Sequence, residues 1–178
     1  MSSRRQAREW ALQLLFGLDL NPDPSKTPEQ VFDEFWNGQL RLREEDDAAG
    51  PPDDHARTFA ESLVRGVTAN REKIDEMLSA RLRNWTLDRL GSVERSVLRL
   101  GAYELAFASD PAPAPVVINE AVDLAKFFGT TESGRFVNGI LDALARRLRA
   151  DRSRDAARPE VWSPGRDPAP APAPGADA

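Results

Sequence analysis

Apolar residues recur every three or four positions from residue 4 to residue 148, and this period constrains the fold more than any other feature of the chain. In the first such segment, residues 4–20, the apolar positions are Ala7, Ala11, Leu14, Leu15 and Leu18. This spacing places one apolar stripe along a helix, and the stripe must pack against another element. Leu, Ala, Glu and Arg dominate over β-branched and aromatic residues, which favours helix over strand. The sequence therefore predicts an all-α chain.

Proline, glycine and capping residues divide this pattern into about seven helices. We expect helices over residues 4–20, 28–42, 59–70, 71–82, 93–105, 117–128 and 131–148. Ser92 is the expected N-cap of the fifth helix, and Gly129 is the expected residue just after the sixth. Glycine inside a helix costs about 1 kcal/mol, so Gly139 predicts a close contact between helices.

Two segments cannot contribute to a core. Residues 43–54 combine six acidic residues with Gly-Pro-Pro and predict an acidic loop. Residues 149–178 are rich in Arg, Asp, Ala and Pro and predict a disordered tail. We therefore expect one helical domain over residues 1–148, followed by a tail over 149–178.

The sequence gives no support for an enzyme. The chain has no cysteine, which excludes a thiolate zinc site and a cysteine nucleophile. It also has no Gly-x-x-x-x-Gly-Lys-Ser/Thr loop and no Gly-x-Gly pair, so the usual nucleotide-binding motifs are missing. The single histidine, His55, follows Asp53 and Asp54 at a helix start, where capping and solvent explain all three. We expect no catalytic residue, cofactor or metal.

Charge and hydropathy limit the cellular setting and the size of any nucleic-acid site. No apolar run approaches the ~20 residues of a membrane span, and the first ten residues lack the apolar stretch of a signal peptide. A cytoplasmic protein with no membrane contact is expected. The net charge of −5 means that any RNA site must be local.

The strongest local charge feature is Arg4, Arg5 and Arg8. At 3.6 residues per turn they fall within about 100° of arc, opposite much of the apolar stripe. A basic ridge at a helix N-terminus suits an anionic phosphate backbone. From charge pattern alone the favoured interpretation is instead that three arginines near a terminus merely make the helix soluble.

Several stretches resemble the NusB family in the expected order. They are RQARE (5–9), ALQ (11–13), VERSVLRLGAYEL (93–105), VINEA (117–121) and FVNGIL (136–141). The resemblance implies about seven helices in two packed three-helix groups. It also implies a transcription antitermination factor that binds boxA RNA of ribosomal RNA transcripts together with NusE, a small-subunit ribosomal protein, and helps RNA polymerase pass terminators.

The resemblance also implies functional residues. The RNA contacts would come from two regions, namely Arg4, Arg5, Arg8 and Phe16 near the start and Ser133, Arg135 and Phe136 near the end. Phe16 stands where many members have tyrosine, and Gln6 replaces an arginine. The NusE surface would include Trp85, Asp88 and Glu94. Phe136 and Trp85 remain open between contact and core residues.

Two other functions have the same fold. The chain could be a protein-interaction module or a homodimer without RNA activity, in which self-association covers the arginine ridge. The fold also forms the RNA-binding domain of a ribosomal RNA cytosine methyltransferase, but no methyltransferase domain follows here and no catalytic cysteine exists.

Overall fold

Helices make up the part of the chain that the computed structural model describes, residues 3–44 and 52–156. They are α1 (Ser3–Leu20), α2 (Pro28–Glu44), α3 (Asp54–Ala69), α4 (Arg71–Ser79), a short 3₁₀ helix η1 (Leu87–Arg89), α5 (Ser92–Ala106), α6 (Ala114–Phe128) and α7 (Thr131–Ala156). No strand occurs in these two ranges, so the all-α prediction is confirmed. No helix described here is long and apolar enough to cross a membrane.

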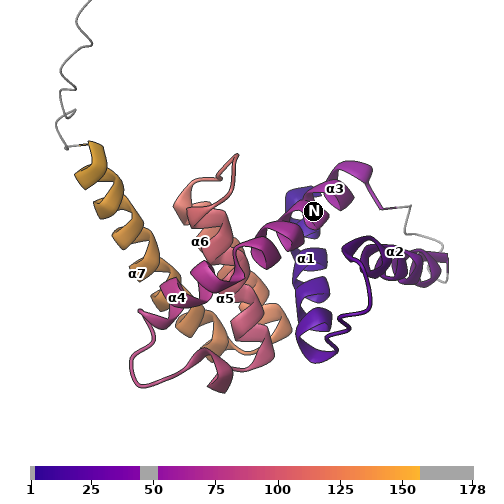
Figure 1. The fold of residues 1–178 in the computed structure, drawn as a ribbon, viewed down its shortest axis with the longest axis horizontal. Coiled ribbons are helices and arrows are strands. Elements are labelled where there is room, and N and C mark those ends of the chain that lie inside the picture. Colours follow the sequence, from indigo (N-terminus) through magenta and orange to yellow (C-terminus); the bar gives the residue numbers. More distant parts are fainter. Residues whose placement is uncertain (1–2, 45–51, 157–178) are drawn as a thin grey trace, which may run out of the picture.

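The helices form two groups that meet at α5 (Figure 1). The first group contains α1, α2 and α3, and the second contains α5, α6 and α7, with α4 beside α5. Helix α5 packs against α1, α3, α4, α6 and α7, as its apolar sequence predicts. Its side chains Val97, Leu98 and Leu100 are almost fully buried. The predicted arrangement of two three-helix groups is therefore confirmed.

Close approach of α5 to its neighbours depends on two glycines. A Cβ atom on Gly66 of α3 would lie 2.1 Å from the Tyr103 ring of α5. A Cβ atom on Gly101 of α5 would lie 2.6 Å from Leu141 of α7. Gly139, by contrast, has open space around it, so the helix contact predicted there is wrong.

Two helix ends differ from the prediction. Gly91, not Ser92, is the N-cap of α5, and Ser92 is the first helical residue. Gly129 follows α6 as expected, but its φ of −124° is not the left-handed conformation that favours glycine. Glycine is needed there because a Cβ atom would lie 2.8 Å from the carbonyl oxygen of Ala125.

The acidic loop predicted over residues 43–54 is shorter at both ends, because α2 extends to Glu44 and α3 begins at Asp54. Glu44 still belongs to α2, and Asp53 accepts a hydrogen bond from the backbone N–H of Ala56 as the N-cap of α3. Residues 45–51 lie outside the described residues.

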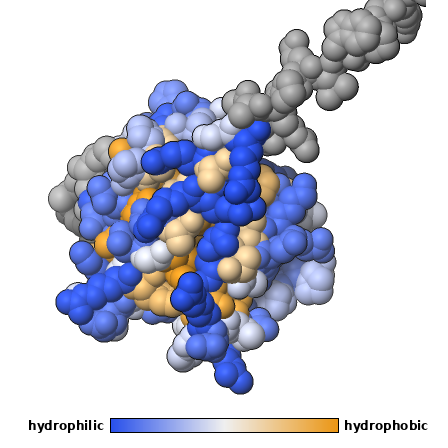
Figure 2. Space-filling model, turned by 90° about the vertical axis from the view of Figure 1, so that its left-hand side faces the viewer, coloured by the Kyte–Doolittle hydropathy of each residue, from blue (hydrophilic) through white to orange (hydrophobic). Residues whose placement is uncertain are grey.

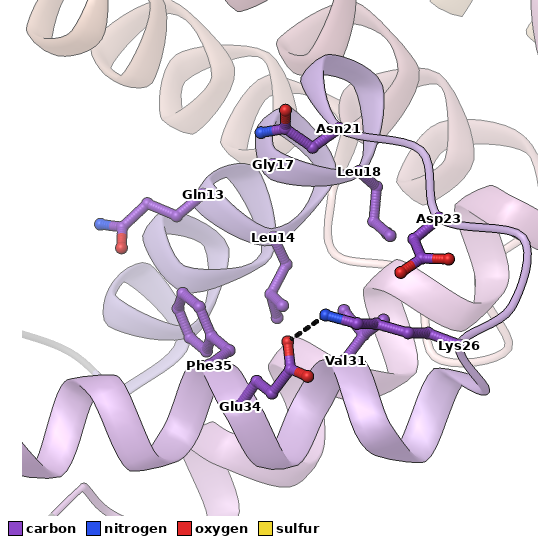
Figure 3. A pocket seen from close by; sticks show the side chains of 10 residues that line it. All are labelled: Gln13, Leu14, Gly17, Leu18, Asn21, Asp23, Lys26, Val31, Glu34 and Phe35. Atoms are coloured by element: carbon purple, nitrogen blue, oxygen red, sulfur yellow. Dashed lines mark hydrogen bonds and ion pairs between the residues drawn. The ribbon is translucent and has the colours of Figure 1, made fainter.

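Helix α2 packs on α1 through large side chains. Trp36 is 2% exposed and meets Trp10 of α1 edge to face, with ring centres 5.2 Å apart. Beside this contact, a pocket of about 340 Å³ lies between α1 and α2. Figure 3 shows Leu14 of α1 pointing toward α2, while Lys26 and Glu34 form an ion pair at 2.7 Å. None of the predicted site residues lines this pocket.

Helix α7 continues beyond the predicted end of the domain at residue 148. Residues 149–156 are helical, so the tail boundary predicted at residue 149 falls within α7, and residues 157–178 lie outside the described residues. Arg152 Nη2 donates to the carbonyl oxygen of Leu105 at 3.2 Å, which anchors this segment on the last turn of α5. Figure 2 looks onto the side of the molecule where α4 and α7 lie, and long hydrophilic side chains cross an apolar surface there.

Candidate nucleic-acid interface

Arg4 and Arg5 lie in the first turn of α1 and pair with carboxylates from distant parts of the chain. Arg4 Nη2 lies 3.1 Å from Asp110 Oδ2 in the loop before α6. Arg5 Nη1 lies 3.4 Å from Asp123 Oδ2 of α6, and Arg5 Nε lies 3.8 Å from Glu9 Oε1. The Arg4 and Arg5 side chains are 54% and 37% exposed. The carboxylates of Asp110 and Asp123 are 85% and 47% exposed, and exposed pairs contribute about 0–1 kcal/mol, so a phosphate can replace these two at low cost.

Arg8 does not lie on the exposed ridge predicted for it. Its side chain is buried against α5, where Nε donates to Glu104 Oε1 at 2.8 Å and Nη2 donates to Glu104 Oε2 at 2.7 Å. Burial alone would lower the pKa of Arg8, but the hydrogen bonds and charge of Glu104 outweigh that effect and raise it. Breaking a buried pair costs about 3–5 kcal/mol. The solvent-accessible ridge therefore consists of exposed Arg4 and half-buried Arg5, while Arg8 fixes α1 on α5.

Carboxylates balance the charge of the two exposed arginines. Burial raises the pKa of Glu9, the charge of Arg5 opposes this rise, and the nearby charge of Glu120 reinforces it. Oε2 of Glu120 is buried and has no hydrogen-bond partner among the described residues. Since negative charge already surrounds Arg5, an RNA phosphate must compete with carboxylates there.

Phe16 is half-buried and lies beside a pocket of about 300 Å³ on the same helix as the arginines. The pocket is lined by Leu12, Gln13, Phe16, Val93 and Phe128, from α1, α5 and α6. No lining residue carries a charge. The ring of Phe16 thus borders a cavity that is mostly apolar.

Ser133 is buried at the start of α7, and its hydroxyl group is already used. Thr130 and Ser133 cap this helix reciprocally, because Ser133 Oγ accepts from the Thr130 N–H and Thr130 Oγ1 accepts from the Ser133 N–H, each at 3.1 Å. Ser133 Oγ also donates to Glu94 Oε1 of α5. The structure therefore gives Ser133 a role in joining α5 to α7 rather than a hydroxyl turned to solvent.

The other two predicted contacts of α7 differ in exposure. Arg135 points to solvent, with its side chain 73% exposed and its Nη1 2.8 Å from Glu132 Oε1. Phe136 is half-buried and packs against the hydrophobic core. Phe136 is thus partly a core residue, and its contact with a ligand stays a prediction.

The predicted partner residues lie next to the start of α7. Trp85 is 56% exposed in the loop before η1, so it is not a core residue. Asp88 is exposed in η1, and Glu94 is half-buried in the first turn of α5. A shallow pocket of about 370 Å³ is lined by Trp85 and Glu94 together with Ser133 and Phe136. The structure thus brings residues of both predicted sites to one depression.

Sequence reasoning missed the acidic partners of these arginines and a central ionic network. The Asp19 carboxylate accepts from Arg71 at 2.8 Å, Arg95 at 3.0 Å and Arg99 at 2.9 Å. Burial alone would raise the pKa of Asp19, but the hydrogen bonds from Arg95 and Arg71 and the charge of Arg99 hold it below its usual value. Arg95 and Arg99 are four residues apart, which predicts one shared face. Nothing in the sequence predicts that this face meets Asp19.

The described residues contain no group of three or more His, Asp or Glu side chains that could hold a metal ion. His55 is exposed in the first turn of α3. The chemistry of this surface is therefore that of guanidinium, carboxylate and aromatic groups.

Comparison with known proteins gives a consistent result. The model of the NusB family matches residues 5–146. The transcription antitermination protein NusB of Bdellovibrio bacteriovorus is 38% identical over 146 residues, which cover 82% of this chain and 97% of that protein.

Two solved structures are similar over most of their length. One is NusB of T. maritima, with a TM-score of 0.67 and 37% identity, covering 80% of this chain and 90% of that chain. The other is a crystal structure of the antitermination factors NusB and NusE in complex with dsRNA, with a TM-score of 0.63 and 32% identity, covering 83% of this chain and 98% of that chain.

Proposed function

Because this chain belongs to the NusB family, we propose that it is a transcription antitermination factor that binds boxA RNA of ribosomal RNA transcripts together with NusE. It acts in the cytoplasm with RNA polymerase, as a binding protein and not as an enzyme. The observation that carries this proposal is the pair formed by exposed Arg4 and half-buried Arg5 at the start of the helix that also bears Phe16.

The RNA-binding surface follows α1. Arg4 and Arg5 bind phosphates, because arginine forms bidentate hydrogen bonds with phosphate and their present partners are weakly held. Phe16 offers an aromatic face for an unpaired base. Arg8 acts by positioning α1 through Glu104, since its guanidinium group is buried.

The start of α7 and the loop around η1 form the second part of the surface. Arg135 is exposed enough to bind a phosphate, whereas Ser133 holds Glu94 in place. Trp85, Asp88 and Glu94 form the surface for NusE, with Trp85 as the aromatic anchor. Phe136 lines the same shallow pocket as Trp85 and can pack against either RNA or NusE.

Transcription in vitro tests this function directly. A template would carry a boxA sequence upstream of a terminator, and readthrough would be measured with RNA polymerase, NusE and the remaining elongation factors. We expect this protein to increase readthrough on the boxA template but not on a template whose boxA sequence is permuted. Equal readthrough on both templates would contradict the proposal.

A further inference from the structure

Phe127, in the last turn of α6, is an exposed aromatic residue that the proposed contacts do not include. Its side chain is 78% exposed, more than that of any other large apolar residue in the described ranges. Its ring meets Phe128 edge to face, with ring centres 4.9 Å apart. A single exposed apolar side chain is common on protein surfaces, so the groups around Phe127 decide whether it can contact a ligand.

Phe127 does not line the pocket that Phe16 borders, but its ring contacts Phe128, which does. Phe128 of α6 lines that pocket together with Phe16 of α1 and Val93 of α5. Phe16 and Phe128 line this cavity of about 300 Å³ and Phe127 contacts Phe128, so the three residues form an aromatic cluster in which Phe127 is exposed and the other two are half-buried.

The cluster adjoins the exposed arginines. Asp123, which pairs with Arg5, stands four residues before Phe127 on α6. Residues four apart share one face of a helix, with a rise of about 6 Å between them. Asp123 therefore lies about one helical turn from Phe127, and Arg5 reaches the same face of α6 through its pair with Asp123.

We propose that Phe127 stacks on an unpaired base of the bound RNA, at the rim of the Phe16–Phe128 pocket, while neighbouring phosphates bind Arg5. This inference rests on the proposed function and adds a base-binding site to it. Proteins that bind single strands combine a basic track with aromatic side chains on which bases stack.

The pocket suits a base better than a protein side chain. Gln13, at its edge, accepts a hydrogen bond from Gln39 through its carbonyl oxygen, and its amide nitrogen has no partner among the described residues. That N–H₂ group can donate to a base edge. A stable protein interface needs about 800 Å² from each partner, and a small pocket with one exposed ring provides much less.

The test uses boxA RNAs that each carry 2-aminopurine at one position, because stacking changes the fluorescence of this base. Wild-type full-length protein, Phe127→Ala and Phe127→Trp would be titrated with each RNA, and anisotropy would give the Kd. Val116→Ala is the matched control, since Val116 is an exposed apolar residue at the other end of α6.

We expect one position to change fluorescence on binding to wild type, and this change to be lost in Phe127→Ala and retained in Phe127→Trp and Val116→Ala. The Kd of Phe127→Ala should rise by about 5- to 150-fold, the range for loss of one stacked base. If wild type binds RNA but Phe127→Ala matches it in Kd and fluorescence, the base site is wrong and the proposed function stands. If Phe127→Ala weakens binding of NusE but not of RNA, the occupant is a protein and the inference fails. If wild type binds no RNA, both the base-binding site and the proposed function fail.

Discussion

At the residue scale, Arg4, Arg5 and Arg8 lie close together on α1 but have different roles, because their carboxylate partners differ in burial. Arg4 and Arg5 have exposed carboxylate partners, whereas Arg8 is buried in a bidentate pair with Glu104. Helical spacing correctly predicts that these residues lie close together. It cannot predict that Arg8 is buried, because Glu104 lies 96 residues away in the sequence.

Asp123 competes with RNA for Arg5, and its removal should strengthen binding. Asp123→Asn removes a charge that pairs with Arg5 and repels phosphate, so we expect RNA affinity to rise by up to about 5-fold, the value of an exposed pair. Anisotropy with labelled boxA RNA measures this change. Asp142→Asn, which removes a similar pair with Arg146 on α7, is the control and should leave the affinity unchanged. Weaker binding by Asp123→Asn would show that the carboxylate helps to place Arg5.

The Arg8–Glu104 pair should contribute to stability rather than to RNA charge contacts. Arg8→Ala leaves Glu104 buried without its partner, so the free energy of unfolding should fall by about 3–5 kcal/mol. The double variant Arg8→Ala with Glu104→Ala should lose less than the sum of the single changes, because no unpaired buried charge remains. Urea unfolding measures the free energy of unfolding of Arg8→Ala, of Glu104→Ala and of the double variant. Additive losses would mean that the two side chains do not interact.

At the element scale, the sequence predicts where helices form better than which side of each helix is packed. Apolar period and proline positions place most helices closely, including the break at Asn70 between α3 and α4. Gly139 was expected to mark a helix contact and has none, whereas Gly66 and Gly101 do. A glycine reveals a need for space only when its neighbour is known, and here the neighbours are Tyr103 and Leu141 from other helices.

Two glycine substitutions should therefore have opposite effects. Gly66→Ala places a methyl group against the Tyr103 ring, and we expect the free energy of unfolding to fall by about 1–3 kcal/mol. Gly139→Ala adds a methyl group in open space inside α7 and should raise it by about 0.5–1 kcal/mol. Urea unfolding midpoints of the two variants and of wild type measure these changes. A Gly66→Ala variant more stable than wild type would contradict the packing of α3 on α5.

At the scale of the whole molecule, charged side chains join the two helix groups. Asp19 at the end of α1 holds Arg71 of α4 and Arg95 and Arg99 of α5. Arg99 Nε also donates to Asp75 of α4 at 2.8 Å. The three pairs of Asp19 connect residues 52 to 80 positions apart, and the Arg99–Asp75 pair connects α5 to α4 across 24 positions. For that reason the apolar pattern predicts the fold but not this network, nor the acidic partners of the RNA surface.

The network should make stability depend on acid pH. The pKa of Asp19 in the folded protein lies below its ordinary value of 3.8, so its contribution is complete above that value and is lost as pH falls through the folded pKa. Glu9 acts in the opposite direction, because its folded pKa is raised above 4.5 and its contribution is lost as pH rises through the folded value.

Urea unfolding at a series of pH values checks this dependence. Below about pH 4 we expect the free energy of unfolding to fall more steeply in wild type than in Asp19→Asn, because the variant cannot take up a proton at this position. Equal slopes for the two proteins in this range would show that Asp19 has the same pKa when folded and unfolded.

Binding of boxA RNA to wild type and to the double variant Arg4→Ala with Arg5→Ala, with and without NusE, tests the central claim most directly. Anisotropy at several salt concentrations would give both the Kd and its salt dependence. We predict that wild type binds boxA RNA more tightly than a permuted RNA, that NusE strengthens this binding, and that the double variant binds more weakly with a salt slope smaller by about 1.4, since each lost phosphate contact reduces the slope by about 0.7. A wild-type protein that binds neither RNA nor NusE at micromolar concentration, or that forms a salt-insensitive homodimer instead, would contradict the account.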